Sequence, residues 1–290
     1  MSSAAEAIQT PETNALPWGL WLRQIRAIVS LELHKNFLSR RSILIYLIAI
    51  LPLLPVLIFA FVPLNPNDVN FNDLSKFYAL LYHNLLLRTV VFFGCAWIFM
   101  NLFRGELVDR SLHYYFLSAV RREVLVTGKY LSGLITAMVL FTATTVLAML
   151  LFYLPHFYSQ SVRFFTEGVG LNHLLAYAGI TMLACVGYGA FFLVVGLFIR
   201  NPIIPALVLY GWEWLNFLLP PLLKKISVIH YLSSMMPVPP STAVSEGPFA
   251  VVAEPTPAWI SIPSMLFVTV VVLIIAAIRT RHMEIRYGND

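Results

Sequence analysis

Six long apolar runs divide the sequence, and they leave almost no fold open to it except a bundle of membrane-spanning helices. In a helix, about 20 apolar residues cross a hydrocarbon core of about 30 Å. Hydrophobic residues make up 59% of the chain and charged residues 11%, whereas a soluble domain has about 25% charged residues. We therefore expect an all-α membrane protein with spans at residues 43–62, 79–103, 131–154, 171–199, 203–219 and 259–278.

Two of these spans contain residues that bear on helix shape and packing. Pro52 and Pro55 lie in the middle of the first span, and a proline inside a helix removes a backbone hydrogen bond and kinks it. In the fourth span, Gly187, Gly189 and Gly196 would let a neighbouring helix approach closely. Together the six spans are expected to form one domain at residues 42–279.

Basic residues are distributed unevenly between the two predicted sides of the membrane. The chain carries 19 Lys and Arg residues against 14 Asp and Glu residues, a net charge of +5. Most basic residues fall on one side; the exceptions are Lys76, Arg88, Arg163, Lys224 and Lys225. This asymmetry is typical of cytoplasmic loops, so we expect a multi-pass protein of the cell membrane, in contact with its lipids, with both termini cytoplasmic. No nucleic-acid partner is expected, because no basic cluster covers one soluble surface.

The segment before the first span changes from polar to amphipathic. Residues 1–17 lack the apolar core of a signal peptide, and we expect them to be disordered in the cytoplasm. Residues 18–41 place apolar and basic residues at helical spacing and begin with Trp18, which is typical of a helix lying in the inner membrane interface. The alternative is a cytoplasmic helix packed on its neighbours. Residues 280–290 are expected to form a basic cytoplasmic tail.

The most polar part of the chain, residues 103–133, lies between the second and third predicted spans. Its basic residues should keep it in the cytoplasm, and they are Arg104, Arg110, Arg121, Arg122 and Lys129. It also holds more large apolar residues than a connecting loop needs, among them Leu112, Tyr114 and Leu117. This mixture predicts a short amphipathic helix at the membrane surface that can bind a soluble partner.

The same stretch resembles the cytoplasmic segment after the second membrane helix in permease subunits of ABC-2 type transporters. The family pattern runs from an acidic residue through Gly-Thr-Leu and a leucine-rich turn ending Pro-x-Arg to Gly-Lys. The matching residues are Glu106 and Asp109, Arg110-Ser111-Leu112, 117–122 and Gly128-Lys129, with Ala119 in place of the proline and Arg110-Ser111 in place of Gly-Thr. Residues 210–219 and 226–237 are similar to the fifth helix of the family and the segment after it, so the resemblance covers residues 22–278.

The resemblance implies a transport subunit that catalyses nothing covalent itself. It implies two copies of an ATP-binding cassette subunit, which bind ATP and Mg²⁺, and a homodimer or a pair with a similar permease. Substrate would move outward. The amphipathic stretch would be the coupling helix that fits a groove on the ATPase, through Glu106, Asp109, Arg110, Ser111, Leu112, Tyr114, Leu117, Arg121 and Arg122. The alternative is an exposed loop whose charges only fix topology.

No motif for covalent chemistry is apparent in the sequence. Gly128-Lys129 lacks the surrounding glycine of a P-loop, so any ATP must be bound by another chain. The seven histidines are scattered and show no metal-ligand spacing. Cys95 and Cys185 lie inside apolar runs, where they are interpreted as packing residues. We predict no catalytic residue, metal or cofactor in this chain.

Two ionisable residues, Arg88 and Glu213, fall inside predicted spans. Counted along ideal helices, they lie about 24 Å and about 20 Å from the cytoplasmic ends. A lone charge near mid-membrane costs about 2.5–3.5 kcal/mol on the most lenient scale, and pairing would lower that cost. We predict that both face the interior and interact, directly or through water, near the translocation route. The alternative is that Arg88 reaches the outer headgroups and Glu213 hydrogen-bonds a neighbouring helix.

Two other function classes are open to such a chain. A transporter driven by an ion gradient would need acidic relays, broken helix pairs or inverted repeats, and no internal repeat is visible. An integral-membrane enzyme acting on lipids would need a clustered polar site at one interface, and none is visible. An ATPase with a Walker motif that is encoded beside the chain or purifies with it would distinguish these classes from an ABC permease.

Overall fold

A computed structural model describes residues 18–39, 42–62, 71–108, 120–155, 158–199, 203–215, 220–224, 227–239 and 256–281. Every regular element in these ranges is a helix, so the all-α prediction is confirmed for them. The elements are α1 (Trp18–Leu38), α2 (Ser42–Ile50), α3 (Leu53–Ala60), α4 (Phe71–Leu81), η1 (Tyr82–Val91), α5 (Phe92–Val108), α7 (Arg122–Tyr153), α8 (Tyr158–Thr166), α9 (Gly170–Phe198), α10 (Ile203–Trp214), α11 (Pro221–Lys224), α12 (Val228–Ser234) and α13 (Ala258–Arg281).

Five helical stretches are long and apolar enough to cross a membrane, which identifies a multi-pass membrane protein. They are Ser42–Ala60, Asn72–Gly105, Arg122–Tyr153, Gly170–Phe198 and Ala258–Thr280. The fifth predicted span, 203–219, corresponds to α10, which has 12 residues and is about 18 Å long. Residues 216–219 lie outside the described part, so the structure supports five spans and a shorter helix where the sequence predicted six spans.

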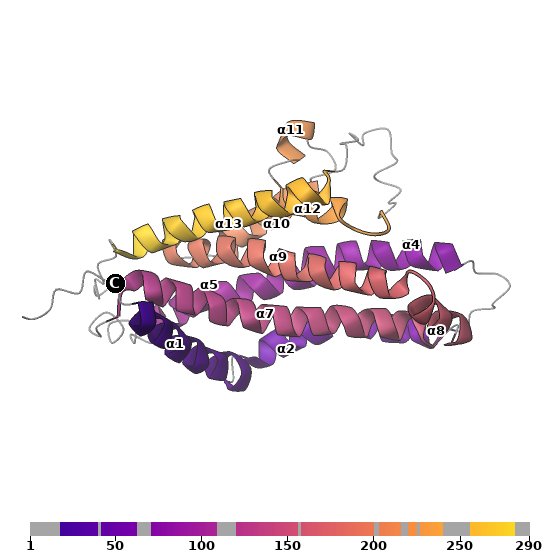
Figure 1. The fold of residues 1–290 in the computed structure, drawn as a ribbon, viewed down its shortest axis with the longest axis horizontal. Coiled ribbons are helices and arrows are strands. Elements are labelled where there is room, and N and C mark those ends of the chain that lie inside the picture. The colour runs from indigo at the N-terminus through magenta and orange to yellow at the C-terminus, as the bar shows by residue number, and fades with distance from the viewer. Residues whose placement is uncertain are drawn as a thin grey trace, which may run out of the picture.

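The spans run side by side along the long axis of the molecule, with α9 in the middle (Figure 1). α9 packs on α5, α7 and α13, and its glycines make close approach possible. A Cβ on Gly196 would lie 2.9 Å from Met100 Cα, and one on Gly189 would lie 2.5 Å from Phe99 Cζ. The predicted close approach is therefore confirmed. The neighbour is α5 at Gly189 and Gly196, and a Cβ on Gly187 would lie 2.8 Å from Met265 Cε of α13.

The first span is broken at the prolines, as the sequence predicts. α2 ends at Ile50 and α3 begins at Leu53, with Pro52 at the N-cap of α3. At the break, the Leu54 amide bonds the Leu51 carbonyl, a tighter turn than the α-helical pattern. Both halves are largely exposed, which suits a helix at the periphery of the bundle facing lipid or another chain.

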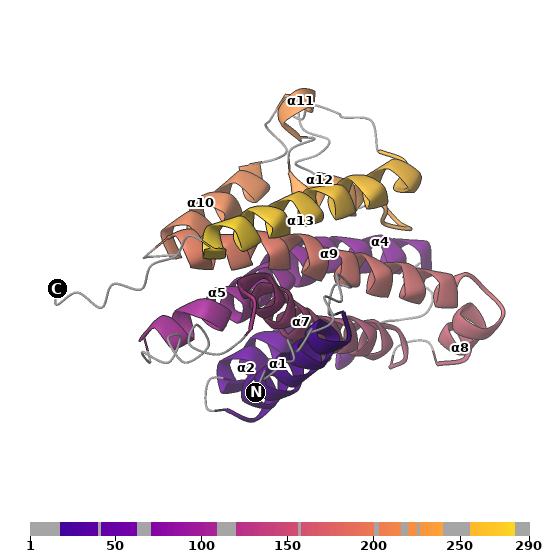
Figure 2. The same cartoon turned by 60° about the vertical axis from the view of Figure 1, so that its left-hand side comes forward.

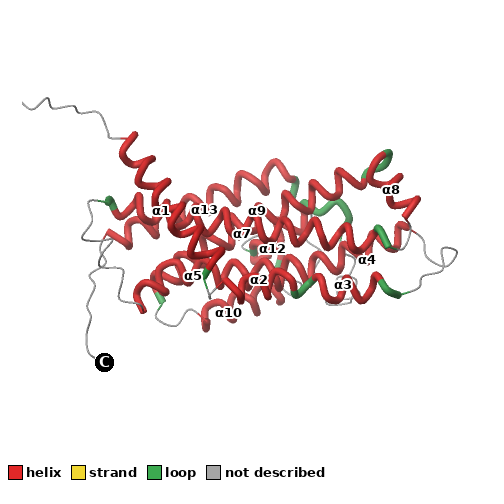
Figure 3. Tube along the Cα trace, turned by 90° about the horizontal axis from the view of Figure 1, so that it is seen from below, coloured by secondary structure: helices red, strands yellow, loops and turns green. Residues whose placement is uncertain are grey.

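One end of the bundle collects the start of α1, the start of α7, the end of α9 and the end of α13. The Arg121 guanidinium lies 4.8 Å from the Trp21 ring, and Arg122 Nη1 donates to the Thr280 carbonyl at 2.9 Å. Arg279 lies 5.3 Å from the Phe198 ring. Figure 2 shows α13 and α1 on opposite sides of the α7–α9 pair, and Figure 3 shows α8 at the other end of the bundle from α1. We call the end that carries Arg121, Arg122 and Arg279 the basic end.

Candidate functional site

The predicted coupling helix lies almost entirely outside the described residues, which omit Asp109, Arg110, Ser111, Leu112, Tyr114 and Leu117. Glu106 belongs to the last turns of α5, where the backbone is described and the side chain is not. Arg121 and Arg122 mark the return of the chain at the start of α7, and they contact α1 and α13. The structure therefore places both margins of the stretch at the basic end, and the coupling helix itself stays a prediction.

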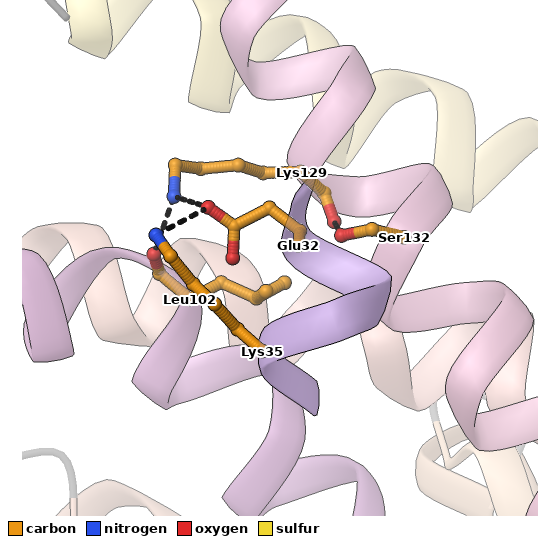
Figure 4. Close-up of polar contacts among 5 residues, drawn as sticks. All are labelled: Glu32, Lys35, Leu102, Lys129 and Ser132. Atoms are coloured by element: carbon orange, nitrogen blue, oxygen red, sulfur yellow. Dashed lines mark hydrogen bonds and ion pairs between the residues drawn. The ribbon is translucent and has the colours of Figure 1, made fainter. Parts of the chain in front are cut away.

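A buried ion pair lies beside these margins, between α1 and α7 (Figure 4). Lys129 is fully buried, and its Nζ lies 2.8 Å from Glu32 Oε1. The same ammonium donates to the Leu102 carbonyl of α5 at 2.9 Å. Lys35 Nζ approaches Glu32 Oε1 from the exposed side at 3.5 Å. One side chain, Lys129, thus joins three helices: α1, α5 and α7.

Local sequence explains why α1 can approach α7 so closely. A Cβ on Gly128 would lie 2.9 Å from Ile28 Cγ2, so only glycine leaves room for the α1 side chain. Further along, Asn36 Nδ2 lies 3.4 Å from Thr136 Oγ1. α1 therefore follows the direction of α7 rather than standing apart as an independent surface helix, which agrees with the alternative of a helix packed on its neighbours. Whether its outer face also lies in the membrane interface stays a prediction.

The ion pair was not foreseen, although Glu32 carried a signal. Glu32 lies four residues after Ile28 and seven after Ile25, so it shares their helical face, and Ile28 is buried. An acid on the apolar face of a basic helix indicates a buried cation elsewhere in the chain, because buried charges are paired. Nothing local in the sequence identifies Lys129, 97 residues away, as that cation.

The second candidate region surrounds Arg88 and Glu213. Glu213 is buried, and its carboxylate accepts hydrogen bonds from Ser227 Oγ at 2.5 Å and from the Val228 and Ile229 amides at 3.1 Å and 3.2 Å. These groups form the start of α12, so Glu213 fixes α12 to α10. This arrangement matches the alternative in which the acid bonds a neighbouring helix.

Arg88 lies close to Glu213 along the bundle but does not bond it directly. Its guanidinium carbon is 5.7 Å from the ring of Trp214, the residue after Glu213. Among the described residues, no ion pair within 4.0 Å joins Arg88 to Glu213. The predicted interaction through water and the translocation role of both residues stay predictions.

The helix that carries Arg88 is not an ordinary α-helix. Tyr82–Val91 forms 10 residues of π-helix between α4 and α5. The Thr89 hydroxyl donates to the Asn84 carbonyl, five residues back, at 2.9 Å. π-Helical segments are rare and concentrate at functional sites. No proline or glycine marks this one, and sequence reasoning missed it.

An apolar groove of about 340 Å³ runs between α2, α5 and α10. Along α5 it is lined by Phe93, Trp97 and Met100, and it ends near Asn101 and Arg104 at the basic end. Its apolar walls and polar end suit an amphiphilic molecule or a second membrane-embedded chain.

The described residues show no arrangement for metal chemistry. No group of three His, Cys, Asp or Glu side chains in that part of the chain could hold a metal ion. Cys95 and Cys185 are both free and buried, which confirms that they are packing residues.

Comparisons with protein-family models, with curated proteins and with solved structures found no match. The fold defines the class as a multi-pass helical membrane protein with a polar, basic end. The resemblance to a particular transporter family rests on sequence motifs.

Proposed function

We propose that this chain is the membrane-spanning subunit of an ABC-2 type transporter, powered by ATP that a separate subunit binds. The observation that carries the proposal is the buried Lys129, which ties α1 and α5 to α7 just after the stretch that resembles a coupling helix. A connecting loop that only fixed topology would not need its flanking helices fastened together by a buried charge.

The same contacts suggest how movement would pass into the spans. A push on residues 109–119 would reach α7 through Arg121 and Arg122, and α1 would move with α7 because Glu32 binds Lys129. α13 would be drawn in through the bond from Arg122 to Thr280. Packed helices respond to such a push by moving as rigid bodies. We infer outward transport by a homodimer, with substrate passing along the groove between α2, α5 and α10.

A transporter driven by an ion gradient is the second candidate. Arg88 and Glu213 favour it, because ionisable residues inside spans often belong to ion or proton pathways. We rank it second because the carboxylate of Glu213 is occupied by three hydrogen bonds to the start of α12. An acid in a proton relay would need to exchange its partners.

Purification of the tagged chain from its own host in mild detergent tests the first candidate. We expect an ATPase with a Walker motif to co-purify, to be identified by mass spectrometry, and to hydrolyse ATP in the complex. The variant Tyr114→Ala/Leu117→Ala should lose this subunit at unchanged permease yield. The matched control is Leu171→Ala/Leu175→Ala, which removes two exposed leucine side chains from α9 at the other end of the bundle. If wild-type protein binds no ATPase in any detergent or in nanodiscs, the ABC proposal fails and the gradient-driven candidate takes its place.

A further inference from the structure

The π-helix brings His83 and Arg88 to the same side of one helix. In an α-helix, residues five apart point roughly 140° away from each other. A π-helix closes its hydrogen bonds between residues five apart, so such residues lie one above the other. The bond from Thr89 to Asn84 has this spacing. The unusual backbone thus aligns an imidazole with a guanidinium inside a membrane span.

Three polar atoms in this region are buried and have no hydrogen-bond partner in the described part of the chain. They are His83 Nδ1, Arg88 Nε and the Tyr188 hydroxyl. His83 is 7% exposed and Tyr188 is 0% exposed. His83 and Arg88 lie about one π-helical turn apart in η1, and Tyr188 packs on Phe92, which follows Arg88 by four residues. Buried polar atoms are almost always hydrogen-bonded, and an unpartnered group indicates water or an ion.

The surrounding residues place this cluster where three helices meet. The Phe92 ring, one residue after η1, packs 5.2 Å from Tyr188 of α9 and 5.4 Å from Tyr210 of α10. One helical turn further along α10, Trp214 covers Arg88. The nearby acid, Glu213, bonds the start of α12 instead of Arg88. The guanidinium charge is therefore not neutralised by direct contact with that carboxylate.

We propose that His83, Arg88 and Tyr188 form a binding site for a single anionic group beside Trp214. A guanidinium, a phenol and an imidazole can all donate hydrogen bonds, and charge-assisted bonds to an anion are the strongest of their kind. The acceptor is a small inorganic anion or the phosphate of an anionic lipid headgroup, which share this chemistry. The site is independent of the ATPase, so its failure would leave the proposed function untouched.

Trp214 provides the measurement, because heavy halides quench tryptophan fluorescence on contact. The full chain in phosphatidylcholine nanodiscs is titrated with iodide at constant ionic strength. Trp214→Phe is titrated in parallel, because the chain has 6 tryptophans and the difference between the two proteins isolates Trp214. We expect the quenching of Trp214 by iodide to reach saturation in the wild-type chain and not to reach it in Arg88→Gln. The control Arg163→Gln removes an equal charge from α8, where the side chain is 80% exposed, and should leave saturation unchanged.

A gentler variant keeps the test decisive if Arg88→Gln folds poorly. Tyr188→Phe removes only the hydroxyl, and we expect iodide to bind about tenfold to a hundredfold more weakly, as for the loss of one hydrogen bond to a charge. The proposal would be overturned by quenching of Trp214 that never saturates in the wild-type chain, or by an iodide affinity that is unchanged in Tyr188→Phe.

A second arm separates the two sources of the anion. Nanodiscs containing phosphatidylglycerol repel iodide from every tryptophan, so quenching is normalised to the Trp214→Phe protein. If the saturable quenching disappears in these discs, the phosphate of an anionic headgroup fills the site; if it remains, a free anion is the ligand. If the Trp214 component neither saturates in phosphatidylcholine nor changes with phosphatidylglycerol, no anion binds there.

Discussion

Lys129 is fully buried, and its ammonium contacts the Glu32 carboxylate and the Leu102 carbonyl. We predict that Lys129→Met destabilises the folded protein by about 3–5 kcal/mol, because it leaves the charge of Glu32 largely buried without its closest partner. Chemical denaturation in detergent, followed by circular dichroism, gives the change in the free energy of unfolding.

Two further variants show whether the burial or the pairing matters. Lys35→Met removes the half-exposed cation that also approaches Glu32, and it should cost less than about 1 kcal/mol. Glu32→Gln/Lys129→Met removes both buried charges and should recover part of the loss. A single variant Lys129→Met as stable as Lys35→Met would show that the ion pair does not hold α1 on α7.

Glu213 is best tested through the helix that it caps. We predict that Glu213→Gln lowers the protection of the Val228 and Ile229 amides from hydrogen exchange, because the neutral amide offers one acceptor oxygen instead of two charged ones. Each hydrogen bond to a charged group contributes about 1.5–3 kcal/mol. Arg88→Gln should leave these amides unchanged, since Arg88 does not bond the carboxylate directly. Equal loss of protection in both variants would show that Arg88 and Glu213 interact after all.

At the scale of elements, α9 approaches the backbone of α5 closely at Gly196. A methyl group there would meet Met100 Cα at 2.9 Å and the Met100 carbonyl oxygen at 3.0 Å. These are backbone atoms and cannot turn aside, so we predict that Gly196→Ala costs about 1–3 kcal/mol. Gly179→Ala, on the same helix, meets nothing within 4 Å and should gain about 1 kcal/mol from helix propensity. If the denaturation midpoints of both variants moved in the same direction, tight packing at Gly196 but not at Gly179 would be contradicted.

The elements also show what a sequence can predict for such a chain. Apolar runs and prolines act locally, so most of the spans and the break before Pro52 follow from hydropathy and backbone chemistry. The π-helix at Tyr82–Val91 does not, because no local residue type distinguishes it from an α-helix. The pairing of Glu32 with Lys129 links distant segments, and hydropathy carries no information about which segments meet.

The described part of α10 ends at Trp214, and residues 216–219 of its apolar sequence lie outside the described residues. Beside that end, Glu213 accepts hydrogen bonds from the start of α12. A buried carboxylate that needs three donors favours a fold that brings those donors close, and hydropathy does not register this requirement. For the coupling stretch, the sequence remains the only guide beyond its two margins.

At the scale of the whole molecule, the first and last described helices meet at one end of the bundle. α1 begins at the basic end and α13 finishes there (Figure 1), where Arg122 bonds the Thr280 carbonyl. α10 also starts at this end and advances about 18 Å, and the chain returns through α13. α10 is thus the first described helix in the part of the chain that connects the end of α9 with the start of α13.

This arrangement predicts the orientation of the protein in the membrane, because basic residues are retained in the cytoplasm. In a Cys95→Ala/Cys185→Ala background, single cysteines are placed at Arg163 of α8, 80% exposed, and at Lys35 of α1, 48% exposed. We expect a membrane-impermeant maleimide to label Arg163→Cys in intact cells and Lys35→Cys only after permeabilisation. Losing Lys35 should cost little stability, since half-exposed ion pairs contribute less than about 1 kcal/mol. Labelling of Lys35→Cys from outside would show the opposite orientation, in which no cytoplasmic ATPase could reach the basic end.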